Sequence, residues 1–154
     1  DLMYALPGQT PAAALADARW PVFVTALYAV PVPLLEGVSQ PAVTQLPRDE
    51  EMGPVCEEGS LGLVETAKVG RDQLSEDDLY LVQMPRGGVA VRWVRVGARC
   101  LYLATARSLR NPAEWEVVET PRSEWTGMLA GRLISFAKPP GYRFQELSLP
   151  RIAN

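Results

Sequence analysis

Short apolar segments rich in β-branched and aromatic residues recur along most of this chain, and they constrain its fold more than any other feature. Gly, Pro and Asp residues separate these segments, as they do at turns between strands. Several short strands at this spacing favour a mostly β protein. We predict strands at residues 22–30, 61–65, 79–84, 89–96, 100–104, 115–118 and 128–136.

Two of the intervals between these segments have the composition of hairpin turns. The sequence Pro-Arg-Gly-Gly at residues 85–88 joins one pair of predicted strands, and Val-Gly-Ala-Arg-Cys at residues 96–100 joins the next pair. Glycine readily adopts the backbone conformations that tight turns require. We therefore expect an antiparallel hairpin at each place.

The N-terminal part of the chain is less regular. We assign residues 1–30 to a linker and a first strand, with one short helix at residues 12–19. Thr10 and Pro11 would supply the N-cap and the first-turn proline of that helix. Prolines interrupt the apolar run at residues 20–35, so it lacks the roughly twenty continuous apolar residues of a membrane span.

Composition excludes several classes of catalytic and metal site. The 154 residues suit a single domain with a net charge of −3, and they include no histidine. Ser-His-Asp and Cys-His mechanisms, and the commonest metal ligand, are therefore excluded. The two cysteines, Cys56 and Cys100, are too few for a thiolate zinc site. We expect reduced thiols, no metal or other cofactor, and a cytoplasmic protein, because no secretory signal is visible.

The most specific motif lies between residues 50 and 65. It reads Glu-Glu-Met-Gly-Pro, a few variable residues, Gly-Ser, and an apolar strand that ends in an acid, Glu65. This stretch resembles the segment of LexA-type self-cleaving regulators that runs Asp-Ser-Met-x-Pro, then Gly-Asp and a similar strand. In that family the serine is the nucleophile. The matching position here is Glu51, whose carboxylate cannot attack a peptide carbonyl as an alkoxide does.

The general base of that family is a lysine on a second strand, in a pattern like Gly-x-x-x-Val-Lys-Arg-Leu. The matching segment here is Gly-Val-Ala-Val-Arg-Trp-Val at residues 88–94, which places Arg92 at the lysine. A lysine can act as a base because burial lowers its pKa, whereas a guanidinium stays protonated at any working pH. Arg92 therefore cannot accept the proton of a nucleophile.

A third departure lies at the scissile bond, which is usually Ala-Gly in the family. The matching bond here joins Gln40 and Pro41, after Val-Pro-Leu-Leu-Glu-Gly-Val at residues 32–38. Proline fixes φ and has no N–H, so it is a poor substitute for a flexible glycine. Ser39 and Ser60 lie near these positions, but neither has a lysine close to it in the sequence. The resemblance implies a degenerate peptidase domain that is not an enzyme.

The same resemblance implies a contact between the two altered residues. Glu51 and Arg92 would lie where the serine and lysine side chains meet in the family, and they would form a charge-assisted hydrogen bond there. The alternative is that both side chains point to solvent and never touch.

Two further segments match in order. Asp-Leu-Tyr-Leu-Val at residues 78–82 is similar to the family's Gly-Asp-Ile-Tyr-Val-Val, and Gly-Arg-Leu-Ile at residues 131–134 is similar to its Gly-Arg-Val-Val. The resemblance implies a coiled antiparallel sheet of the LexA/signal-peptidase-like type with few short helices. We assign residues 31–140 to this domain. Residues 141–154 are too apolar for a free tail, and we expect them to pack on their own domain or on a partner subunit.

The resemblance also implies a function by association. Family members pair two such domains through C-terminal strands and so bring two DNA-binding domains together. We expect a homodimeric, non-cleaving domain of a transcriptional repressor of the DNA damage response, which contacts DNA only through an N-terminal domain absent from this chain. The alternative is a stand-alone UmuD-like adaptor or inhibitor that binds a protein partner. The predicted dimer interface comprises Met128, Leu129, Leu133, Ile134 and Phe136.

Charge is unevenly distributed along the sequence. Acidic residues crowd residues 49–58, whereas residues 79–113 contain six arginines and no acid. These arginines would form a basic face for DNA or an acidic partner only if they shared one side of the sheet. Strand alternation instead scatters them over both faces, and we expect some of them to pair with acidic residues.

Overall fold

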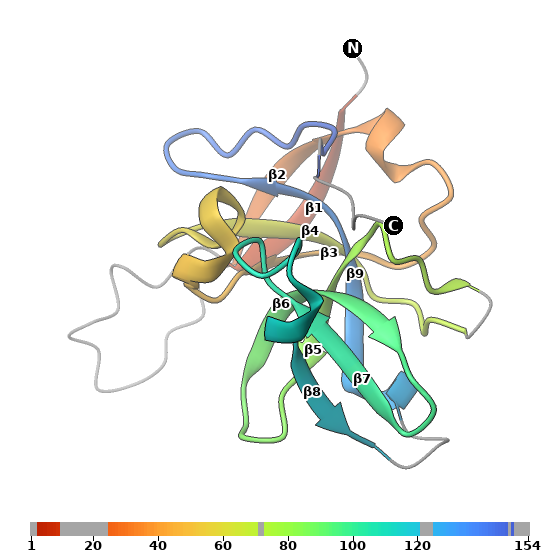
Figure 1. Ribbon diagram of the computed structural model, residues 1–154. Coiled ribbons are helices and arrows are strands. Elements are labelled where there is room, and N and C mark those ends of the chain that lie inside the picture. Colours follow the sequence, from red (N-terminus) through yellow and green to blue (C-terminus); the bar gives the residue numbers. More distant parts are fainter. Residues whose placement is uncertain (1–2, 10–24, 71–72, 121–124, 148, 150–154) are drawn as a thin grey trace.

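The computed structural model describes residues 3–9, 25–70, 73–120, 125–147 and 149 (Figure 1). These residues form a nine-stranded sheet in the order β2-β1-β3-β4-β9-β5-β6-β7-β8, and the sheet does not close into a barrel. The predicted fold class, mostly β, is confirmed. The strands are β1 (Met3–Gln9), β2 (Thr25–Pro31), β3 (Pro41–Gln45), β4 (Leu61–Glu65), β5 (Leu79–Gln83), β6 (Val89–Val96), β7 (Cys100–Ala104), β8 (Glu116–Glu119) and β9 (Leu129–Ala137).

Neighbouring strands of the sheet are antiparallel with one exception. β1 runs parallel to β3, with Gly8 opposite Val43, so the sheet is mixed, although most of its strand pairs are antiparallel, as predicted. The helices that lie wholly within the described residues are short 3-10 turns. They are η2 (Val32–Leu35), η3 (Glu50–Cys56), η5 (Pro112–Glu114) and η6 (Trp125–Met128).

The strand predictions are accurate in the centre of the sheet. Residues 61–65, 89–96 and 100–104 coincide with β4, β6 and β7. The prediction for β5 extends one residue too far, and those for β8 and β9 are shifted by one residue toward the N-terminus. Residues 25–31 form β2, while the predicted start at residues 22–24 lies outside the described residues, as does the predicted helix at 12–19.

Two strands differ from the prediction. Residues 3–9, which we assigned to a linker, form β1 and pair with β2 in a continuous seven-residue register. Residues 41–45, where we predicted no strand, form β3. This strand begins at Pro41, and the first residue of a strand tolerates the missing N–H. Pro7 and Gly8 give β1 a weak strand propensity, so its extended form depends on its pairing partners.

Both predicted hairpins are present. The Met84 N–H donates to the carbonyl of Gly88 at 3.0 Å and closes the turn between β5 and β6. Gly87 and Gly88 have φ angles of 95° and 77°, which glycine adopts without strain. The Gly97 N–H donates to the carbonyl of Cys100 at 2.8 Å in the turn between β6 and β7.

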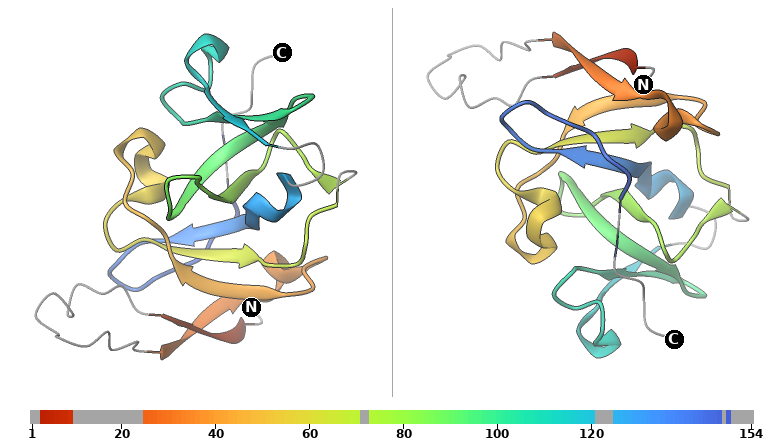
Figure 2. Two further views of the ribbon diagram at one scale, coloured as in Figure 1. Left: turned by 90° about the horizontal axis from the view of Figure 1, so that it is seen from below. Right: turned by 90° about the horizontal axis from the view of Figure 1, so that it is seen from above.

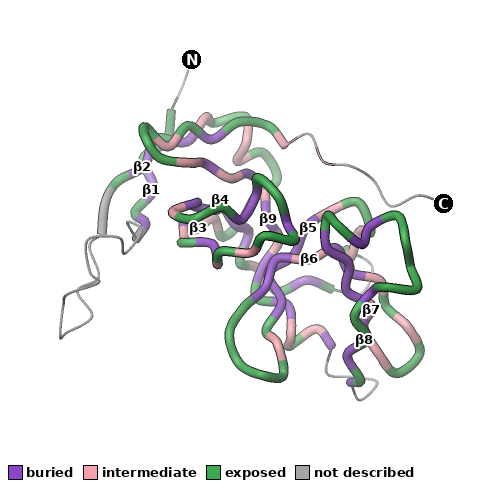
Figure 3. Tube along the Cα trace, turned by 60° about the vertical axis from the view of Figure 1, so that its left-hand side comes forward, coloured by how far each residue is buried: buried purple, intermediate pink, exposed green. Residues whose placement is uncertain are grey.

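The sheet bends so that its two ends lie on opposite sides of the molecule. Figure 2 shows the β1–β2 ribbon at one end and β7 with β8 at the other. Buried residues follow the central strands between these ends (Figure 3), and they form three clusters of apolar side chains. β9 takes part in all three clusters: Leu129 belongs to one, Leu133 and Phe136 to another, and Ile134 and Ala137 to the third.

β9 is a central strand with both backbone edges paired. It is antiparallel to β4 on one side and to β5 on the other, with a register shift on each side. Gly131 lies at this crowded point. A Cβ there would collide with the Val64 side chain and lie 2.9 Å from the Glu65 carbonyl oxygen. The close approach of β4 to β9 therefore requires glycine.

The segment after β9 packs on its own chain. Phe144 is buried in the cluster that contains Tyr28 and Val30. The buried Ser135 hydroxyl donates to the Gln145 carbonyl at 2.5 Å and accepts from the Gln145 N–H at 3.1 Å. Beyond this anchor, Leu147 and Leu149 pack against a second cluster. Within the described residues, we find no helix with the length and apolar character needed to cross a membrane.

Candidate functional site

The loop that carries the altered nucleophile position begins with an aspartate cap. Asp49 has an extended backbone, and its carboxylate accepts a hydrogen bond from the Glu51 N–H at 3.0 Å, which starts η3. Met52, Val55 and Cys56 point inward from this turn, whereas Glu51 is exposed. The motif residues thus anchor the turn, and the position that matches the nucleophile faces outward.

Arg92 reaches this turn from β6. Its side chain is only 12% exposed, and its Nη1 atom lies 2.6 Å from Oδ2 of Asp49, whose side chain is 19% exposed. The same nitrogen donates to the Val91 carbonyl at 2.8 Å. One Asp49 oxygen therefore caps η3 while the other holds the guanidinium, so a single carboxylate joins η3 to β6.

The predicted ion pair between Glu51 and Arg92 is wrong. Both residues line a depression of about 220 Å³, but within the described residues the Glu51 carboxylate makes no ion pair. The alternative was that both side chains point to solvent. Glu51 is exposed, but the Arg92 side chain is largely buried, so the alternative is wrong for Arg92. The reason is local: the cap places the Asp49 carboxylate toward β6, and Arg92 binds this nearer acid.

The rest of the depression contains a pair of hydroxyl residues that the sequence analysis missed. Thr105 and Ser108 bond reciprocally: the Thr105 N–H donates to Ser108 Oγ at 2.9 Å, and the Ser108 N–H donates to Thr105 Oγ1 at 3.1 Å. Their hydroxyls are 3.1 Å apart and both residues are buried. These bonds hold a turn after β7. The signal in the sequence was the Thr-x-x-Ser spacing directly after a strand.

The thiol next to the Asp49–Arg92 pair is poorly suited to act as a nucleophile. The pKa of Cys56 is raised to about 12, mainly by burial and also by the Asp49 carboxylate, with the Arg92 cation partly opposing both. At neutral pH almost no thiolate forms. Cys56 and Cys100 are both free.

The position that matches the scissile bond is held elsewhere in the sheet. The Glu65 carboxylate at the end of β4 accepts hydrogen bonds from the N–H groups of Ser39, Gln40 and Ala67 at 2.6, 2.9 and 3.0 Å. The Gln40 carbonyl in turn accepts from the N–H and the hydroxyl of Thr66, both at 2.9 Å. We call this arrangement the Glu65 clamp.

Glu65 is 8% exposed, and its charge is stabilised by this geometry. Burial by itself would raise the pKa of Glu65, but the bonds from Ala67, Ser39 and Gln40 outweigh it and lower the pKa. The sequence analysis noted the acid at the end of the strand without giving it a role.

The structure does not bring the Gln40–Pro41 bond to the Asp49–Arg92 pair. Pro41 begins β3 opposite Glu65, whereas the other end of β3, at Gln45, leads toward η3. Three strands lie between β3 and β6 in the sheet. The matched nucleophile and base positions share a depression, and the matched cleavage position lies apart from them.

The predicted interface residues belong to β9 and the turn before it. Leu129 and Leu133 are buried, and Met128, Ile134 and Phe136 are partly buried against clusters of the same chain. Because both edges of β9 are paired internally, a partner could reach only these side chains. The interface therefore stays a prediction.

An exposed apolar surface lies instead on the outer side of β1 and β2, where the sequence analysis proposed no site. We call it the outer face, and it consists of three cross-strand pairs, Met3 with Pro31, Ala5 with Ala29, and Pro7 with Leu27. Leu27 is 73% exposed and Met3 is 52% exposed. Neither strand contains a charged residue. On the other side of the ribbon, Leu6, Tyr28 and Val30 are buried.

Several arginines of residues 79–113 pair with acids, as expected for a scattered distribution. Arg95 binds Glu76 with a nitrogen–oxygen distance of 2.7 Å, and Arg86 lies 3.4 Å from Glu116. Together with the Asp49–Arg92 pair, these contacts neutralise part of the positive charge that a basic face would need. Within the described residues, no cluster of three or more His, Cys, Asp or Glu side chains is arranged to hold a metal ion.

Comparisons with known proteins add no family assignment. No protein-family model matches the chain, and no curated protein matches it significantly.

Proposed function

We propose that this chain is the non-cleaving, dimer-forming domain of a LexA-like transcriptional regulator. Ordered short motifs support the family, and the residues at the nucleophile and base positions support the loss of cleavage. Arg92 is a permanent cation held by Asp49, so it offers no basic atom to a nucleophile. A domain with this arrangement can act by binding, and the outer face is the observation that carries the proposal.

The occupant that we propose for the outer face is a second copy of the chain. In a two-fold dimer the same patch meets itself, so any charge on it would face a like charge. The outer face is apolar in every cross-strand pair and carries no charge, which makes it compatible with self-association.

In this function the dimer sets the distance between two DNA-binding domains, each joined to one copy of this domain. Paired domains bind operator half-sites together, and the affinity of the pair exceeds that of either alone. Release from DNA then requires a trigger other than self-cleavage. The setting we propose is the cytoplasm.

Substitution of Leu27 by Arg is expected to break the dimer. Each two-fold contact would bury two unpaired guanidinium groups in an apolar surface, so the dimer dissociation constant should rise at least about 100-fold. Sedimentation velocity across a concentration series measures this change. The matched control is Val117→Arg, because Val117 is 55% exposed on β8 at the other end of the sheet. We expect V117R to dimerise like the wild type.

Two results would reject dimerisation through the outer face. One is a wild-type chain that stays monomeric at tens of micromolar, which would favour the adaptor function. The other is an L27R variant that dimerises with the wild-type constant.

The purified chain is also expected to remain intact under conditions that promote self-cleavage in a peptidase with a lysine base. A lysine base whose pKa is lowered by burial is unprotonated at pH 10, whereas Arg92 keeps its charge. After prolonged incubation at that pH, intact-mass analysis should give a single species. A pair of fragments separated at the Gln40–Pro41 bond would contradict the proposal.

A further inference from the structure

A cavity that is partly open to solvent lies between η3, the end of β9 and the segment that follows β9. Its volume is about 480 Å³, within the usual range for small-molecule sites. Its wall is mostly apolar and comes from distant parts of the sequence. The apolar lining residues are Met52, Pro54, Val55, Trp93, Ala106, Phe136, Ala137, Leu147 and Leu149.

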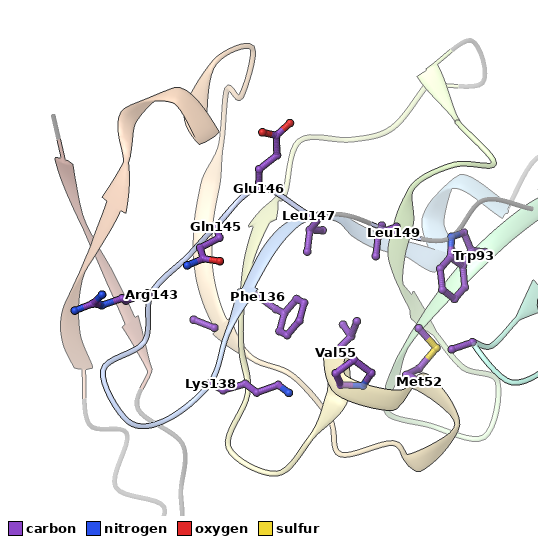
Figure 4. A pocket seen from close by; sticks show the side chains of 13 residues that line it. Met52, Val55, Trp93, Phe136, Lys138, Arg143, Gln145, Glu146, Leu147 and Leu149 are labelled. Atoms are coloured by element: carbon purple, nitrogen blue, oxygen red, sulfur yellow. The ribbon is translucent and has the colours of Figure 1, made fainter. Parts of the chain in front are cut away.

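The apolar side chains converge on a common space. Figure 4 shows Val55, Phe136, Leu147 and Leu149 turned toward one another, with the Trp93 indole at one end. Arg143 and Glu146 also line the cavity, but their charged groups extend away from this space (Figure 4).

One polar atom in the wall lacks a partner. Trp93 is 1% exposed, and no described protein atom accepts a hydrogen bond from its Nε1–H. In Figure 4 this nitrogen is on the edge of the ring next to Leu149. Trp115, another buried tryptophan, donates its Nε1–H to the Ser108 carbonyl at 2.7 Å. Because buried donors are normally paired, the Trp93 N–H is an unused donor. Its nitrogen has almost no exposed surface, so an acceptor reaches it only when the wall beside Leu149 moves outward.

The cation near the cavity is already neutralised. Lys138 Nζ lies 2.9 Å from the Glu57 carboxylate and 5.9 Å from the centre of the Phe136 ring. An anionic ligand would have to compete with Glu57 for this ammonium group. The lining therefore favours an uncharged ligand over a carboxylate.

We propose that this cavity binds a neutral, mostly apolar small molecule that carries one carbonyl-type acceptor, which receives the Trp93 N–H. The apolar body of the ligand is surrounded by Phe136, Val55 and Leu147. The segment after β9 forms one wall, and the ligand shifts this wall on binding. Ahead of Leu147, that segment is anchored by the edge contact of Tyr142 with Tyr28, by Phe144 and by the two Ser135–Gln145 bonds. The site lies within one chain, so the inference is independent of dimerisation.

Two probes of nearly the same shape test the proposal. 2-Acetylnaphthalene has a carbonyl acceptor, and 2-ethylnaphthalene has none. Their affinities are measured on protein labelled with ¹⁵N-tryptophan, where Trp93→Phe identifies the Trp93 indole resonance. We expect 2-acetylnaphthalene to move this resonance downfield and to bind about tenfold more tightly than 2-ethylnaphthalene. In W93F, which keeps an aromatic ring but no N–H, the two affinities should become equal.

A second variant tests the location without altering the core. Ala106 is exposed where it lines the cavity, so Ala106→Trp should obstruct the opening and weaken both probes at least about tenfold. Thermal unfolding checks that both variants fold. Equal affinities of the two probes for the wild type, no binding of either, a preference retained in W93F, or unchanged binding to A106W would each overturn the proposal.

Discussion

Replacing Arg92 by Met should destabilise the fold by about 3 kcal/mol, because the substitution leaves the Asp49 carboxylate largely buried without its cation. Methionine keeps most of the aliphatic stem of arginine, so the loss of stability reports the removal of the charge and its hydrogen bonds. Equilibrium unfolding in urea at pH 7 measures the change. The Asp49–Arg92 pair joins η3 to β6, and we expect η3 to lose protection from hydrogen exchange first.

A double-mutant cycle separates the ion pair from the cap. Asp49→Asn removes the charge but keeps an oxygen that can accept the Glu51 N–H. The double variant D49N/R92M contains no unpaired charge, so its destabilisation should be smaller than the sum of the two single effects by at least about 1.5 kcal/mol. Additive effects would mean that the two side chains do not interact.

An exposed ion pair provides the matched control. Arg86 and Glu116 have side chains that are 81% and 40% exposed. Solvent screens such a pair, so Arg86→Met should change stability by less than about 0.5 kcal/mol. If R86M and R92M lower the free energy of unfolding equally, burial of the Asp49–Arg92 pair would not explain the destabilisation by R92M.

The sequence was most informative where local signals and tertiary structure agree. β4, β6 and β7 are each short, mostly apolar runs next to turn residues, and their predicted limits are exact. β1 was missed because its sequence, Met-Tyr-Ala-Leu-Pro-Gly-Gln, carries Pro7 and Gly8 within the strand. Its extended form comes from pairing with β2 and β3, which lie 16 or more residues away, and no local pattern records such contacts.

The candidate site illustrates the same limit. Motif matching predicted that Arg92 binds Glu51; both residues line one depression, but Arg92 binds Asp49 instead. That choice depends on the extended backbone of Asp49, which turns one carboxylate oxygen to the η3 cap and the other to β6. The cavity beside Trp93 was invisible for a related reason, since its walls come from four separate segments.

Replacing Glu65 by Gln should cost about 2–3 kcal/mol at pH 7, because the clamp presents only donors to this side chain. A carboxylate can accept all three N–H groups on its two oxygens. A glutamine side chain has only one acceptor oxygen. Its NH₂ group is a donor and would face a backbone N–H, which is also a donor. Amide hydrogen exchange should accelerate at Ser39, Gln40 and Ala67, which report the clamp directly.

The pH dependence follows from the lowered pKa of Glu65. A carboxyl group whose pKa is lower in the folded state stabilises the fold above its unfolded pKa, about 4.3 for glutamate. That contribution disappears as the pH falls through the folded-state pKa. The stability difference between the wild type and E65Q should therefore be constant between about pH 6 and 8 and shrink below about pH 4.

Glu58→Gln is the matched control for the clamp, because Glu58 is exposed and lies in a turn before β4. This variant should differ from the wild type by less than about 0.5 kcal/mol and show no change in exchange at Gln40. An E65Q variant as stable as E58Q at pH 7 would mean that Glu65 does not hold the segment that contains Ser39 and Gln40.

The Glu65 clamp also bears on the proposed function. It fixes the Gln40–Pro41 bond in the sheet, so the position that matches a scissile bond is bound at the end of β4 and is not free to enter a cleft.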